Sequence, residues 1–181
     1  PNNDGETPLH IAFKGRDEYV VQYLMNDSSD LNVRDKYGNT PLHMAAKNGF
    51  LHERLSDSWQ GEGVDINSRN NKGETPLHVA CYRGHDDSVK FLLSRRGMQI
   101  NASNNEGNTP LHEAAARGSL FMVEELGRND GININPPNKL GNTPLHIACM
   151  KKKQEMVEYL VSRSDMINNV CNNEGNTPLH L

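Results

Sequence analysis

The sequence predicts an all-α fold, a solenoid of antiparallel helix pairs that are joined by β-hairpin-like loops. Three observations predict it. The four residues Thr-Pro-Leu-His occur six times at intervals of 33 to 35 residues, a glycine stands two residues before each of these threonines, and an apolar stripe with helical spacing follows in most copies. A fixed period of this length is typical of repeat architectures, in which each unit buries its faces only against its neighbours.

Each unit is predicted to begin with a turn and a capped first helix. Glycine supplies the positive φ of the turn. Threonine caps the helix, and proline suits the first helical position because its missing N–H would have no partner there. The histidine can hydrogen-bond through its ring nitrogens and tie one unit to the next. The motif residues of the full units are Thr7, His10, Thr40, His43, Thr75, His78, Thr109, His112, Thr143 and His146.

A second helix is predicted after the first in most units. Its signature is apolar residues one turn apart, which form a stripe on one face. In the first unit the stripe is Val20, Val21, Leu24 and Met25. The same spacing recurs in later units, with a thinner version in the fourth, at Val89, Leu92, Leu93, Met122, Val123, Leu126, Val157, Leu160 and Val161. A turn and a short extended piece follow each stripe.

The second unit departs from this pattern over residues 51–63. Leu51, Leu55 and Trp59 still fall on one helical face, but the usual valine and leucine positions are missing. We expect this stretch to be the least stable part of the chain, because it offers few apolar contacts. Trp59 either substitutes for the missing core residues or is an exposed aromatic anchor for a partner.

The repeated unit resembles the ankyrin repeat family. The shared pattern is Gly-x-Thr-Pro-Leu-His-x-Ala, as in residues 141–148, followed by the second-helix valines and leucines. The resemblance covers essentially the whole chain and implies about five full repeats plus a truncated sixth. It predicts a single array over residues 1–181, a fragment of a longer protein, with units that begin near residues 5, 38, 73, 107, 141 and 175.

Composition and spacing argue against several other functions. The net charge of −4, from 19 basic and 23 acidic residues, disfavours nucleic-acid binding. Six histidines share one slot of successive units, about 8–10 Å apart, so they are too far apart to share an ion. No catalytic motif is present, and the sequence predicts no enzyme, no metal, no cofactor and no small-molecule substrate. The cysteines Cys81, Cys149 and Cys171 form no disulfide framework, and we expect an intracellular protein, cytoplasmic or nuclear.

The family resemblance implies a scaffold that binds another protein, or another domain of its own chain, through the hairpin tips and the exposed side of the first helices. Arg83, Arg117 and Lys151 occupy one slot of successive units and are predicted to form a basic row. We expect this surface to dock an acidic or mixed segment. The matching positions are Tyr37, Lys47, Tyr82, Arg83, Arg117, Met150 and Lys151.

Three other interpretations of this surface remain open at the level of sequence. The charged row could be a solvated face without a partner. The array could be a passive spacer or an intramolecular regulatory arm within a larger multidomain protein. Binding of nucleic acid or anionic lipid through Lys151–Lys153 is a further alternative, but it rests on three lysines, and we expect no insertion into a membrane.

Overall fold

The computed structural model describes residues 1–26, 30–52 and 63–181. These residues form helices and loops and contain no strand, so the predicted all-α class is confirmed. The chain divides into two compact units, Pro1–Met98 and Gln99–Leu181, and each is described by itself.

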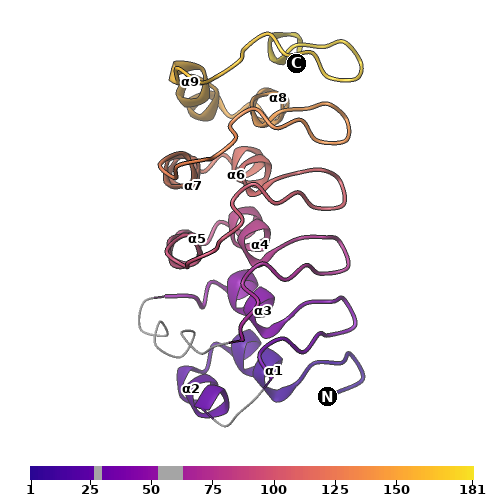
Figure 1. The fold of residues 1–181 in the computed structure, drawn as a ribbon, viewed down its shortest axis with the longest axis vertical. Helices are drawn as coiled ribbons and strands as arrows, with labels where there is room; N and C mark the ends of the chain where they lie inside the picture. Colours follow the sequence, from indigo (N-terminus) through magenta and orange to yellow (C-terminus); the bar gives the residue numbers. More distant parts are fainter. Residues whose placement is uncertain (27–29, 53–62) are drawn as a thin grey trace. The chain divides into compact units, whose positions relative to one another are not determined.

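In unit 1 the first helices of successive repeats pack against one another. Helix α1 packs against α3, and α3 against α4, whereas the second helices α2 and α5 pack against α1 and α4 (Figure 1). This is the predicted helix-pair arrangement. The helices are α1 (Pro8–Gly15), α2 (Glu18–Asn26), α3 (Pro41–Asn48), α4 (Pro76–Arg83) and α5 (Asp86–Leu93).

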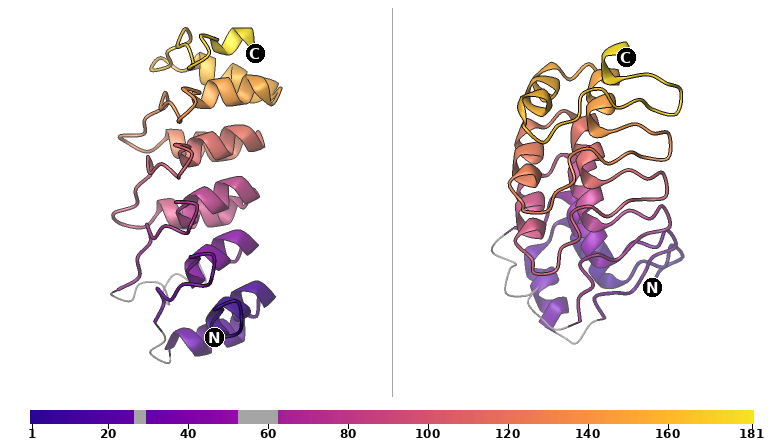
Figure 2. Two further views of the ribbon diagram at one scale, coloured as in Figure 1. Left: turned by 90° about the vertical axis from the view of Figure 1, so that its right-hand side faces the viewer. Right: turned by 45° about the horizontal axis from the view of Figure 1, so that its top comes forward.

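Unit 2 repeats this arrangement. Helix α8 packs against α6 and against a short 3-10 turn, η3, while the second helices α7 and α9 pack against α6 and α8. In each unit the hairpin-like loops project on the side of the first helices (Figures 1 and 2). The elements of unit 2 are α6 (Pro110–Arg117), α7 (Leu120–Gly127), α8 (Pro144–Met150), α9 (Gln154–Ser162) and η3 (Pro178–His180).

The histidine of the repeated motif joins neighbouring repeats, as predicted. The backbone N–H of Thr40 donates to Nδ1 of His43 at 3.2 Å, which leaves Nε2 to donate to the carbonyl oxygen of Glu74 at 2.9 Å. Because an N–H can only donate, Nδ1 is unprotonated and the ring is the neutral tautomer with its hydrogen on Nε2. The Nε2 atoms of His10, His112 and His146 lie 3.0, 2.9 and 3.0 Å from the carbonyl oxygens of Asn39, Asn142 and Asn176.

The first helices end in two ways. Gly49, Gly84 and Gly118 adopt positive φ at the C-cap, a conformation that glycine reaches without steric penalty. At the ends of α1 and α8 the positive φ falls instead on Arg16 (57°) and Lys152 (54°). The backbone of these two residues is therefore in the left-handed region, which is unfavourable for a residue that has a Cβ.

The core lies along the faces between helices and includes most of the predicted stripe. Each first helix buries its motif leucine, and the second helices fully bury Val21, Val89, Leu92, Met122, Val123 and Leu126. Val20 and Val161 also belong to the stripe, but they are 43% and 45% exposed. In α9 the residue that is buried beside Leu160 is Met156, 1% exposed, which stands one helical turn before it.

Within the described ranges, no helix is long and apolar enough to span a bilayer. The cysteines differ in burial: Cys81 is buried, Cys149 is half-buried and Cys171 is exposed. Burial raises the pKa of the Cys149 thiol.

Candidate functional site

A pocket of about 470 Å³ lies in unit 1, between the hairpin loops and the exposed sides of α3 and α4. It brings together four of the residues that the sequence predicts for binding, namely Tyr37, Lys47, Tyr82 and Arg83. The other residues that line it are the motif residue His43 and six residues that are not among the positions predicted for binding, namely Asn39, Asn70, Asn71, Lys72, Glu74 and Val79.

Hydrogen bonds hold the pocket's base. His43, 1% exposed, donates to the main-chain oxygen of Glu74, and Asn70 donates from Nδ2 to the Glu74 carboxylate at 2.8 Å. The Asn70 side chain also donates to Oδ1 of Asn39 at 3.1 Å and accepts from the backbone of Lys72 at 2.9 Å. These bonds fix the Glu74 carboxylate before any ligand arrives, which lowers the ordering cost of binding.

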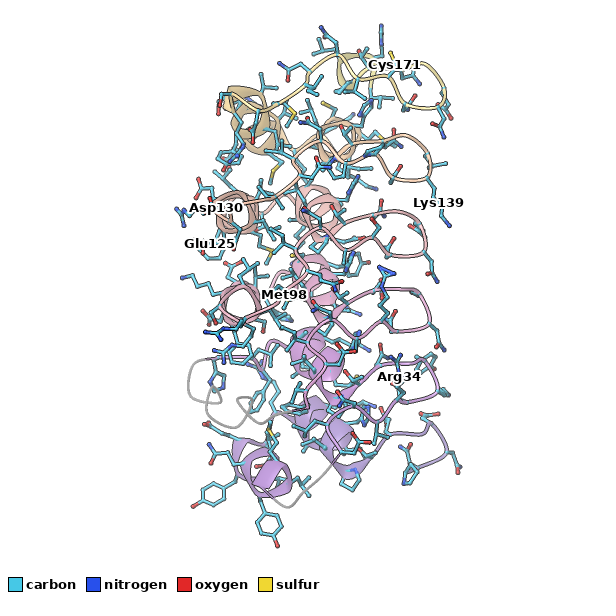
Figure 3. The ribbon with its side chains drawn as sticks, in the orientation of Figure 1. Arg34, Met98, Glu125, Asp130, Lys139 and Cys171 are labelled. Atoms are coloured by element: carbon cyan, nitrogen blue, oxygen red, sulfur yellow. The ribbon has the colours of Figure 1, made fainter. Side chains whose placement is uncertain are left out.

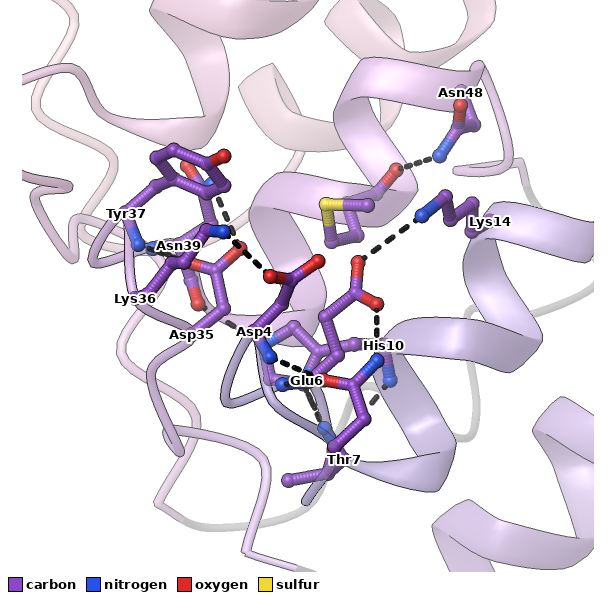
Figure 4. Close-up of polar contacts among 12 residues, drawn as sticks. Asp4, Glu6, Thr7, His10, Lys14, Asp35, Lys36, Tyr37, Asn39 and Asn48 are labelled. Carbon is purple, nitrogen blue, oxygen red and sulfur yellow. Dashed lines mark hydrogen bonds and ion pairs between the residues drawn. The ribbon is translucent and has the colours of Figure 1, made fainter.

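The loop wall of the pocket is tied across two repeats. The Asn71 backbone donates to the Tyr37 carbonyl oxygen at 3.0 Å, and its side chain donates to the Lys36 carbonyl oxygen at 3.1 Å. The Tyr37 ring remains 58% exposed, with the Lys36 ammonium 5.0 Å from its centroid. Lys36 itself pairs with Asp4, a contact drawn in Figure 4 that lowers the pKa of that carboxyl through a hydrogen bond.

An exposed aromatic ring and three cations line the pocket, with Lys47 and Arg83 on its helical wall and Lys72 on its loop wall. Tyr82 is 57% exposed, and the Arg83 guanidinium lies 5.6 Å from its ring centroid. Lys47, Lys72 and Arg83 are exposed and make no ion pair with any carboxylate of the described ranges. Glu74 is the only acid among the residues that line the pocket, so its surface is positively charged with apolar rings between the charges.

The remaining predicted residues lie in unit 2. Arg117 ends α6, Met150 ends α8 with 48% of its surface exposed, and Lys151 is the exposed C-cap of α8. At a loop tip of the same unit, Lys139 projects outward beside Leu140, which is 65% exposed (Figure 3). Arg83 belongs to unit 1, so the continuous basic row from Arg83 to Lys151 stays a prediction.

His85 lies at the junction of two helices. Its Nε2 donates to the Lys47 carbonyl oxygen at 3.1 Å, and its ring lies where a Cβ on Gly49 would be. The ring thereby fastens α5 to the end of α3. Leu55 and Trp59 lie outside the described residues. Both interpretations of Trp59 and the expected low stability of residues 51–63 therefore stay predictions.

The residues described in the structure contain no group of three or more histidine, cysteine, aspartate or glutamate side chains arranged to hold a metal ion. Four repeat histidines, His10, His43, His112 and His146, use both ring nitrogens, one for the cap and one for the neighbouring carbonyl, so their role is structural.

The helix pairs, the histidine links and the loops on one side define a helical repeat protein of the interaction class. A family described as ankyrin repeats (3 copies) matches residues 1–55, 52–138 and 130–181. The chain therefore belongs to the ankyrin repeat family, as the sequence predicted. This repeat is a non-enzymatic interaction fold, and the chain is a protein–protein interaction module of this general kind.

Curated relatives are similar to parts of the chain. NF-kappa-B inhibitor alpha of Gallus gallus is 44% identical over 50 residues, 28% of this chain and 16% of the relative. The nuclear factor NF-kappa-B p105 subunit of Rattus norvegicus is 42% identical over 50 residues, 28% of this chain and 5% of the relative. Ankyrin repeat domain-containing protein 53 of Homo sapiens is 38% identical over 53 residues, 27% of this chain and 10% of the relative. The matched segments thus span a small part of each relative.

Proposed function

We propose that this chain binds a segment of another protein through the inner face of its first helices and its hairpin tips, and that the pocket of unit 1 is the main binding site. The observation that carries the proposal is the gathering of Tyr37 and Tyr82 with Lys47, Lys72 and Arg83 around one pocket. Tyrosine and arginine are enriched among residues that dominate binding energy.

The charge of the pocket favours an acidic or mixed segment. Three cations that pair with no carboxylate in the described part of the chain attract such a segment from solution and set its orientation. The two tyrosine rings offer apolar area at a small cost in side-chain entropy. In unit 2, Arg117, Met150 and Lys151 extend the proposed surface if the chain forms the single array that the sequence period predicts.

The test is affinity capture of a binding protein, followed by measurement of its affinity for purified variants. The double variant Tyr82→Ala/Arg83→Glu should lose the binding protein, because it removes one aromatic wall and reverses one charge. Arg96→Glu is the matched control, since Arg96 is an exposed arginine of unit 1 that does not line the pocket. Circular dichroism must first show that all three proteins fold.

Equal affinity for the wild type and the double variant would refute the pocket as the binding site. Loss with Arg117→Glu/Lys151→Glu instead would move the site to unit 2. If the wild type retains no protein, the alternative is favoured: a passive spacer, or a regulatory arm whose partner is another domain of the same protein. We propose an intracellular setting, cytoplasmic or nuclear.

A further inference from the structure

The first repeat contains an acid–base pair that the third repeat reproduces only in part. In the first, Asn2 donates to Oε2 of Glu6 at 2.9 Å, and the Lys14 ammonium lies 3.3 Å from Oε1 (Figure 4). The hydrogen bond from Asn2 and the charge of Lys14 together lower the pKa of the Glu6 carboxyl. Both oxygens of this carboxylate thus have partners, and the side chain is buried.

The third repeat has the same asparagine and glutamate but lacks the lysine. Positions 2, 6 and 14 correspond, 68 residues later, to Asn70, Glu74 and Tyr82. Asn70 donates to Oε2 of Glu74 at 2.8 Å, as Asn2 does to Glu6. Where Lys14 would stand there is a tyrosine, and within the described ranges Oε1 of Glu74 has no hydrogen-bond donor and no ion-pair partner. This open oxygen belongs to a residue that lines the pocket.

A segment that covers the pocket takes Glu74 out of water. A carboxylate that loses water without gaining a donor is costly, so the segment must bring a donor to Oε1. The pair of Glu6 with Lys14 shows which group this site geometry accommodates, namely a primary ammonium. The exposed Tyr82 ring beside it can pack against the methylene stem of a lysine side chain.

We propose that the pocket recognises a lysine side chain of the bound segment, whose ammonium pairs with Oε1 of Glu74, and that acidic residues flank this lysine. This inference rests on the proposed function and names the chemistry of the bound segment. The acidic flanks follow from Lys47, Lys72 and Arg83, which would repel an isolated cation but attract a lysine between carboxylates.

The experiment uses the full chain and two synthetic peptides, measured by fluorescence anisotropy. Both peptides have aspartate and glutamate at each end and a central residue between two leucines, which is lysine in one and norleucine in the other. The wild type should bind the lysine peptide about fivefold more tightly, the effect of one partly exposed charge pair. Glu74→Gln should abolish this preference and leave the affinity for the norleucine peptide nearly unchanged.

Two further variants sharpen the test. Tyr82→Lys restores the lysine of the first repeat, so it should occupy Oε1 internally and also remove the preference for the lysine peptide. Glu106→Gln is the control, because Glu106 is an exposed loop-tip acid of unit 2. It should keep the preference.

The outcomes separate this inference from the proposed function. If both peptides bind equally and Arg83→Glu weakens both, the pocket binds acidic segments but the lysine subsite is refuted. A preference that survives Glu74→Gln also refutes it. If neither peptide binds the wild type, the lysine subsite is refuted, and capture of a binding protein that depends on Tyr82 and Arg83 then decides the proposed function separately.

Discussion

Replacement of His43 by alanine tests the claim that the motif histidine holds neighbouring repeats together. The ring is 1% exposed and has three hydrogen bonds: Nδ1 accepts from the N–H and the hydroxyl of Thr40, and Nε2 donates to the Glu74 carbonyl oxygen. After His43→Ala the Thr40 N–H loses the ring acceptor in a buried position, whereas the Glu74 oxygen keeps the bond from the Asn70 backbone at 3.0 Å. The unsatisfied N–H of Thr40, together with the lost bonds to the Thr40 hydroxyl and the Glu74 oxygen, costs about 2–4 kcal/mol in the free energy of unfolding.

The matched control is His180→Ala. His180 occupies the same slot and its Nδ1 accepts from the Thr177 N–H at 3.1 Å, but the residue is exposed, so water can replace the ring. This change should cost less than about 1 kcal/mol. Urea unfolding followed by circular dichroism at 222 nm measures both variants. If His43→Ala unfolds at the same urea concentration as His180→Ala, the ring does not join the repeats energetically and the reasoning is wrong.

Two further predictions concern pH and backbone strain. Burial lowers the pKa of His43, so the unfolded chain binds its proton at higher pH than the folded chain. The contribution of this group to stability is then complete above the unfolded pKa of about 6.5 and is lost as the pH falls through the folded value. The melting temperature should therefore fall as the pH is lowered from 7.5 to 5. In His43→Gln it should depend less on pH, and an unchanged pH dependence would contradict the assignment to His43. Arg16→Gly and Lys152→Gly should each stabilise the chain by about 0.5–1 kcal/mol, because glycine relieves the positive φ, whereas Gly49→Ala should destabilise it. Lower urea midpoints for both glycine variants would show that these two positions carry no strain.

The local structure of each repeat could be predicted from sequence because its causes are local. The threonine cap, the proline and the preceding glycine act within a few residues, and their period gives the number of units without a structure. The second-helix stripe was predicted less well. Met156 was missed, and Val20 and Val161 belong to the predicted stripe but are exposed, because burial of a helix face depends on which neighbouring helix lies against it.

The candidate site was predicted only in part. Tyr37, Lys47, Tyr82 and Arg83 could be chosen because the repeat register assigns them to tips and helix ends. Glu74 could have been found by comparing positions 6 and 14 with 74 and 82, which shows an acid that has lost its lysine. The pocket itself could not be predicted from sequence, because its volume depends on the distances between two loops and two helices.

The sequence by itself determined the repeat, the caps and the family, since these follow from short-range backbone preferences that recur at a fixed period. The tertiary structure decided which charges find partners. Among the described residues it pairs Glu6 with Lys14 but gives the Glu74 carboxylate the amide of Asn70 alone, and it leaves Arg83 without a carboxylate although Asp86 and Asp87 are close in sequence. The physical reason is that an ion pair requires two side-chain ends to meet within about 4 Å, a condition that packing sets and composition does not.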